Sequence, residues 1–87
     1  MCEYARKIEE VILEMLAKRG DGKTICPSEA ARRIAELEGR PEAWRSWMKR
    51  TQATATDMAS RGKLVILQHG EQVDPATARG PIRLGRP

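Results

Sequence analysis

The stretch from Gly20 to Arg33, GDGKTICPSEAARR, constrains the fold of this chain more than any other part of the sequence. Gly20 is suited to end a helix, because glycine readily adopts the left-handed conformation that follows a last helical turn. Lys23–Ile25 can form a short extended run, and Pro27 is suited to the first position of a new helix. Helix, short strand and helix is the order in which a winged helix-turn-helix begins, so this stretch predicts that fold.

Helices are predicted on both sides of this stretch. Apolar residues at helical spacing predict one amphipathic helix from about Glu3 to Arg19. A second helix is predicted to start after Cys26, which with Glu29 has the spacing of a capping box, in which the glutamate reaches back to a free amide. Gly39 is expected to stop this second helix. Its buried side is expected to consist of Ala30, Ala31, Ile34, Ala35 and Leu37.

A third helix is predicted from about Glu42 to Ser60, opened by Pro41 and closed at Gly62. We expect Trp44 to be buried and Trp47 to lie at the margin of the core, which favours packing over a platform for stacking bases. The apolar side of the helical wheel holds Trp44, Trp47, Met48, Thr51, Ala55, Met58 and Ala59. The opposite side holds Arg45, Lys49, Gln52, Ala53 and Thr56, with Arg50 at its flank.

After the third helix, the sequence predicts a small sheet. Leu64–Leu67 is a continuous apolar run typical of a strand, and Ile82–Leu84 can return beside it as the other arm of a hairpin. The twelve residues His69–Gly80 between them form the wing, in which Asp74–Thr77 is expected to make a capped helical turn. With the short extended run between the first two helices, these strands predict an α+β fold, a winged helix-turn-helix with three helices and a small antiparallel sheet.

Length and cysteine content narrow the class of protein. A chain of 87 residues corresponds to one domain, residues 1–87, with no room for a second catalytic lobe. Cys2 and Cys26 have no paired spacing, so we expect free thiols in a reducing cytoplasm rather than disulfides or a cysteine metal site. No signal peptide and no run long enough to span a bilayer is apparent, so we expect a soluble cytoplasmic protein without a membrane partner.

The charge is unevenly distributed along the chain. The net charge is +4, yet nine of the twelve acidic residues fall between Glu3 and Glu42. One end of the molecule is therefore expected to be basic, which is the electrostatic pattern of proteins that bind a phosphate backbone. The alternative is that the excess charge serves solubility alone, as in many small basic domains.

The polar side of the third helix is the sharpest functional candidate. In a helix-turn-helix, the second helix of the motif enters the major groove, where Arg and Gln read base edges and Lys contacts phosphate. The alternative is an ordinary solvated face, which any amphipathic helix of a small domain needs. The candidate nucleic-acid-binding residues on this helix are Arg45, Lys49, Arg50, Gln52 and Thr56.

The wing provides the second candidate. Arg79 and Arg83 can contact phosphates along an adjacent groove, as the wings and basic arms of DNA-binding proteins do. The alternative is that Arg79 pairs with Asp74 across the same short turn, which would fix the wing and make that cation less available to phosphate.

Catalytic and metal sites are not predicted. A thiol at a helix start can be activated, but no residue near Cys26 completes a catalytic set, and the only histidine, His69, lies in the wing. One histidine and no carboxylate cluster on a helix face also argue against a transition-metal site. We therefore expect no enzymatic activity, no cofactor and no bound metal.

Four passages of the chain carry a resemblance to known proteins: KTICPSE at 23–29, the helix around Trp44, Arg45 and Met48, RGKL at 61–64, and VDPATARGPIRL at 73–84. Over nearly its whole length the chain resembles a family of small uncharacterised bacterial proteins, a domain of unknown function with a winged-helix fold. The resemblance implies the fold and brings no activity or ligand with it.

Two function classes follow from these observations. The sequence favours binding of double-stranded DNA through the third helix and the wing, with a homodimer or protein partner enlarging the interface that one small module offers. The alternative is a protein interaction module of the same fold that binds no DNA.

Overall fold

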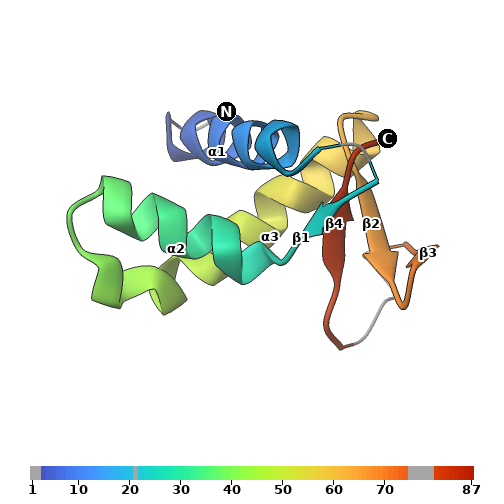
Figure 1. Ribbon diagram of the computed structural model, residues 1–87. Coiled ribbons are helices and arrows are strands. Elements are labelled where there is room, and N and C mark those ends of the chain that lie inside the picture. Colours follow the sequence, from blue (N-terminus) through green and yellow to red (C-terminus); the bar gives the residue numbers. More distant parts are fainter. Residues whose placement is uncertain (1–2, 21, 75–79) are drawn as a thin grey trace.

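The computed structural model describes residues 3–20, 22–74 and 80–87, and it contains three α-helices and a four-stranded antiparallel sheet (Figure 1). The helices are α1 (Glu3–Arg19), α2 (Pro27–Leu37) and α3 (Trp44–Ser60), with a short 3₁₀ helix, η1 (Pro41–Ala43), before α3. The strands are β1 (Thr24–Ile25), β2 (Val65–Gln68), β3 (Glu71–Gln72) and β4 (Arg83–Gly85). Figure 1 shows the strands side by side at one end of the helices. This α+β architecture confirms the predicted winged helix-turn-helix layout.

Glycines end the helices where the sequence predicted. Gly20 follows α1 at φ 95° and donates its amide to the carbonyl of Leu16 at 3.2 Å. Gly39 follows α2 at φ 81°, and Gly62 follows α3 at φ 74°. Positive φ costs glycine little, because it has no Cβ to collide with the neighbouring carbonyl.

The start of α2 differs from the expected capping box. Cys26 occupies the cap position in an extended conformation, but its side chain makes no capping hydrogen bond. The carboxylate of Glu29 forms an ion pair with Arg19, at the end of α1, instead of reaching back to a backbone amide. A charged guanidinium is a stronger partner for a carboxylate than a neutral amide, and a thiol is a poor capping acceptor. The capping-box prediction is therefore wrong, although the helix begins at the predicted residue.

The prediction for Leu37 is also wrong. Its side chain is 47% exposed, whereas the other residues predicted for the buried side of α2 are buried. Leu37 is the last residue of α2, and the turn through Gly39 carries the chain away from it.

The sheet has the strand order β1-β4-β2-β3. The expected hairpin arms pair as β2 and β4, with Ile66 opposite Leu84, and β1 adds to the other side of β4. The sequence analysis did not predict β3, which pairs with β2 through a tight turn at His69 and Gly70, both at positive φ. Two such residues give the twist that suits a two-residue hairpin loop. The helical turn predicted at Asp74–Thr77 lies mostly outside the described residues.

The core lies where the three helices meet the sheet. Its fully buried side chains are aliphatic or methionine except for Thr51, whose hydroxyl donates to the carbonyl of Trp47 at 2.8 Å, so burial of apolar surface is the main stabilising contribution. The largest fully buried side chains are Ile8, Ile12, Ile25, Ile34, Thr51, Met58, Leu64, Ile66 and Leu84. Both helices of the helix-turn-helix, α2 and α3, contribute to it, which holds α3 in place and leaves its outer face to solvent.

Candidate nucleic-acid interface

Helix α3 presents the predicted polar stripe to solvent. Arg45, Lys49, Gln52 and Thr56 are all exposed. Thr56 donates its hydroxyl to the carbonyl of Gln52 at 3.0 Å, a bond within the helix. Within the described part of the chain, the side chains of Lys49 and Gln52 make no hydrogen bond or ion pair. Their donors are therefore available to a ligand.

Trp44 is not buried as predicted. It is partly exposed at the first turn of α3, and two guanidinium groups lie over its ring. The Cζ of Arg32, from α2, lies 3.9 Å from the ring centroid, and the Cζ of Arg45 lies 4.7 Å from it. The position is apolar on the helical wheel, but at this end of α3 the neighbouring element supplies a cation rather than an aliphatic side chain. We call Arg32, Trp44 and Arg45 the Trp44 cluster.

Arg50 belongs to a second aromatic contact, on the side of α3 that faces α1. Its Cζ lies 5.4 Å from the ring centroid of Tyr4 and 5.2 Å from that of Trp47. The two rings meet edge to face with centroids 5.3 Å apart. Trp47 is partly buried against the core, as predicted for a residue at its margin. Arg50 is thus directed away from the stripe that contains Lys49.

Ion pairs neutralise many other cations of the molecule but not those around the start of α3. Within the described residues, no carboxylate oxygen lies within 4.0 Å of a nitrogen of Arg32, Arg45, Lys49 or Arg50. Among the described residues, Arg6, Lys23, Lys63 and Arg83 also have no such pair, and the last three lie on or next to strands that meet at β4. The pairs elsewhere are Lys7–Glu38, Lys18–Glu14, Arg19–Glu29, Arg33–Glu36, Arg40–Glu42, and Arg61 with both Glu9 and Asp57.

Of the two arginines predicted to contact phosphate from the wing, the structure describes only Arg83. Arg83 donates Nε to the hydroxyl of Thr24 at 2.9 Å and an Nη to the carbonyl of Thr24 at 3.1 Å. These bonds hold its guanidinium against β1, at the side of the sheet away from β2. Arg79 lies outside the described residues, and so does its predicted pair with Asp74.

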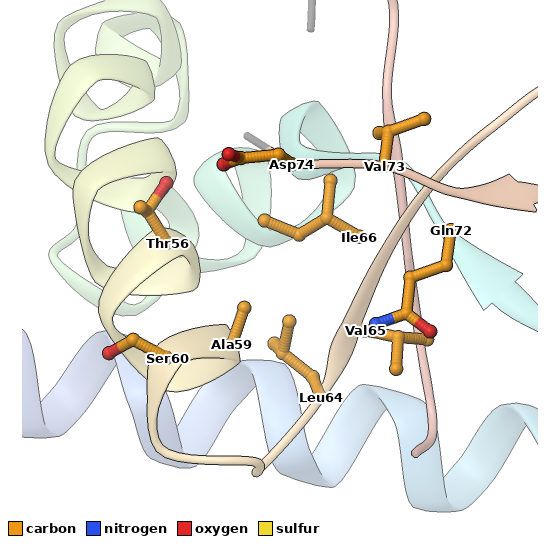
Figure 2. Close-up of a pocket in the computed structure, with 9 residues that line it drawn as sticks. All are labelled: Thr56, Ala59, Ser60, Leu64, Val65, Ile66, Gln72, Val73 and Asp74. Atoms are coloured by element: carbon orange, nitrogen blue, oxygen red, sulfur yellow. The ribbon is translucent and has the colours of Figure 1, made fainter. Parts of the chain in front are cut away.

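A cleft of about 670 Å³ separates the second half of α3 from the strands of the wing (Figure 2). Thr56 and Ser60 contribute hydroxyl groups to it from α3. Its apolar lining consists of Ala59, Leu64, Val65, Ile66 and Val73. Figure 2 shows the carboxylate of Asp74 extending toward α3. Thr56, the last residue of the stripe, therefore lines this open cleft together with Gln72, Val73 and Asp74 of the wing.

A comparison with known protein families identifies the family of this chain. Residues 5–87 match the model of a family described as "Protein of unknown function (DUF3253)". The chain belongs to the DUF3253 family. No curated protein matches it.

Arg32 is the residue of this DUF3253 protein that the sequence analysis missed. On the helical wheel of α2 it falls on the polar side, where it looks like any solvated arginine. Its placement over Trp44 depends on the angle at which the turn through Gly39 returns the chain to α3. The only local indication of this cluster in the sequence was Trp44 at the start of a predicted helix, followed directly by Arg45.

The structure of this DUF3253 protein also places Cys26 and the other side chains that could bind a metal ion. Cys26 is a free thiol whose Sγ accepts a hydrogen bond from the hydroxyl of Ser28 at 3.1 Å. Among residues 3–20, 22–74 and 80–87, no three metal-ligating side chains come together. No helix within those ranges has the length and apolar character needed to cross a bilayer.

Proposed function

We propose that this protein binds double-stranded DNA, with α3 in the major groove and the wing along the phosphate backbone. One observation carries the proposal: among the described residues, the cations at the start of α3 have no carboxylate partner, while carboxylates neutralise many of the cations elsewhere. Unpaired cations grouped on one helix and its neighbour create a local positive potential, which is the electrostatic footprint of nucleic-acid binding.

The stripe on α3 suits both kinds of contact that a recognition helix makes. Gln52 can donate to base edges in the groove, and Arg45 and Lys49 can contact phosphates at its border. Thr56 lies one turn after Gln52, with its hydroxyl on the same exposed side. Arg50, held toward α1, is proposed to contact phosphate at the edge of the groove.

The wing is proposed to contact the backbone beside that groove. Arg83 uses two of its five guanidinium donors on Thr24, so the others can donate to a phosphate oxygen. Arg79 belongs to the same proposal on the basis of its position in the sequence alone.

The proposal extends to the partners and the cellular compartment of the protein. One helix and a wing bury a limited area, so we propose that a homodimer or a protein partner supplies the rest of a specific interface. We also propose that the family is a bacterial winged-helix family acting in the cytoplasm, without enzymatic activity. A free thiol at Cys26 supports a reducing compartment.

The test is fluorescence anisotropy of a labelled random-sequence duplex, titrated at about 50 mM and about 200 mM salt. Each phosphate contact contributes about 0.9 to the slope of log affinity against log salt, so losing two contacts lowers the slope by up to about 1.8. For Arg45→Ala, Lys49→Ala, the affinity deficit relative to the wild type is then expected to shrink by about twelvefold from low to moderate salt.

The matched control is Arg6→Ala, Lys63→Ala. Both residues are exposed, neither has an ion pair among the described residues, and they lie on α1 and just before β2, outside the proposed interface. The control removes the same charge and is expected to keep the wild-type slope to within about 0.5, since no proposed phosphate contact is lost. No binding by the wild type at low salt, or equal losses in both double variants, contradicts the proposal. If the wild type binds no DNA at low salt, the alternative function, a protein interaction module, would be favoured.

A further inference from the structure

The Trp44 cluster is a surface feature for which the helix-turn-helix layout alone gives no reason. It lies beside the stripe of α3 and takes one of its cations from α2. We infer that Arg32 and Arg45, ordered by the ring of Trp44, form a contact site for a DNA phosphodiester at the edge of the groove that α3 enters. This inference rests on the proposed function and adds Arg32, from outside the α3 stripe, to the phosphate contact of Arg45.

Two like charges share one aromatic surface in this cluster. The guanidinium groups of Arg32 and Arg45 both lie within 5 Å of the same ring centroid, at 3.9 and 4.7 Å. The attraction of each cation to the ring offsets part of their mutual repulsion. An anion bound between or beside them would remove that repulsion and add hydrogen bonds to both.

The carboxylates that could neutralise the cluster have other partners. Along α2, Glu29 pairs with Arg19, and Glu36 lies 3.8 Å from Arg33. Before α3, Glu42 lies 3.3 Å from Nε of Arg40. The pKa of Glu42 is lowered, first by a backbone hydrogen bond and next by the hydrogen bond from Arg40. Each nearby negative charge is therefore engaged elsewhere, and the cluster keeps its charge.

The chemistry of the cluster matches a phosphodiester. A guanidinium is planar and donates two parallel hydrogen bonds to two oxygens of one phosphate. Stacking on an indole restricts the rotamers of a long side chain before the ligand arrives, which lowers the entropy lost on binding. Because guanidinium groups already cover its ring, Trp44 acts as a positioning residue and not as a base-stacking platform.

The position of the cluster favours the backbone over the bases. Arg32 extends from α2, which packs against α3 but lies outside the groove-facing stripe. In a helix-turn-helix, the helix that precedes the recognition helix crosses the sugar-phosphate backbone. Arg32 is thus placed beside Arg45 to contact the strand that borders the groove.

The first test compares Arg32→Ala with Arg33→Ala in the same anisotropy titration. The two residues are neighbours on α2 and carry the same charge, but Arg33 is turned toward Glu36. We expect Arg32→Ala to lower the salt slope by about 0.9, so that its affinity deficit shrinks about three- to fourfold between 50 and 200 mM salt. Arg33→Ala is expected to keep the wild-type slope. Circular dichroism confirms that both variants are folded.

The second test addresses Trp44 as a positioning residue. Trp44→Leu removes the ring and keeps both cations, so we expect an unchanged salt slope and a loss of affinity of about two- to tenfold for each arginine that must then be immobilised on binding. Trp44→Phe is expected to recover part of this loss. In the Arg32→Ala background the effect of Trp44→Leu is expected to shrink, because one of its two cations is already gone.

The outcomes separate the inference from the proposed function. If the wild type binds DNA and depends on Arg45 and Lys49, but Arg32→Ala behaves as Arg33→Ala does, the Trp44 cluster is no phosphate site and the proposed function stands. Equal effects of Trp44→Leu with and without Arg32 would show a purely structural tryptophan and overturn the ordering role. If the wild type binds no duplex DNA, both proposals fail together.

Discussion

The turn between α2 and α3 depends on Gly39, and replacing this residue tests how the helix-turn-helix is held. Gly39 has φ 81° and donates its amide to the carbonyl of Glu36 at 3.0 Å. The next residue, Arg40, donates its amide to the carbonyl of Ala35, also at 3.0 Å. These two bonds form a Schellman motif, which satisfies the last carbonyls of α2 and requires a left-handed residue at position 39.

The cost of Gly39→Ala can be worked out from the backbone alone. A Cβ built at Gly39 meets no atom within 4 Å, so the substitution creates no clash. An alanine in the left-handed region costs about 1–2 kcal/mol. Alanine also reduces the conformational entropy of the unfolded chain, which stabilises the folded state by about 0.4–1 kcal/mol. The net loss of stability is therefore about 1 kcal/mol, which for a domain of this size lowers Tm by about 4–8 °C.

Thermal unfolding followed by circular dichroism measures this shift, and Gly39→Asn provides the comparison. Asparagine tolerates the left-handed region better than alanine does, so its Tm is expected to lie between those of wild type and Gly39→Ala. DNA affinity at 25 °C should stay unchanged, because the folded state still dominates. A Tm for Gly39→Ala equal to or above that of the wild type, or a greater loss for Gly39→Asn, would refute the conformational argument.

Two further predictions concern the core and a surface charge. Ile34 is fully buried on α2, so Ile34→Ala is expected to lower the free energy of unfolding by about 2–5 kcal/mol in urea with an unchanged m value; a loss below 1 kcal/mol would contradict the core assignment. The pKa of Glu14 is lowered, first by the hydrogen bond from Lys18 and then by the positive charge of Lys18. This pair therefore stabilises the fold at pH values above the ordinary glutamate pKa of about 4.3, and the stabilisation is lost as the pH falls through the lowered pKa. Titration by NMR should show the Glu14 midpoint rising in Lys18→Ala, and an unmoved midpoint would argue against the pair.

The sequence by itself determined the elements that depend on local interactions. The periodicity of apolar residues placed all three helices, and positive-φ glycines ended them, because both signals act within a few residues of the chain. The apolar run before Gln68 identified β2. The resemblance over nearly the whole chain agrees with the match to the DUF3253 family at residues 5–87.

Only the tertiary structure decided which partners the polar and aromatic side chains found. Glu29 has the spacing of a capping box, yet the end of α1 brings Arg19 close enough to take its carboxylate. Likewise, β3 exists because β2 offers it a neighbour, and its two residues carry no strand signal of their own.

The candidate site divides in the same way. The exposure of Lys49 and Gln52 followed from the period of one helix, which is a local property. The Trp44 cluster required the angle between α2 and α3, which is set by the turn at Gly39 and by packing in the core. Charge pairing and stacking act between residues distant in sequence, so only the folded chain selects among the partners that each side chain could have.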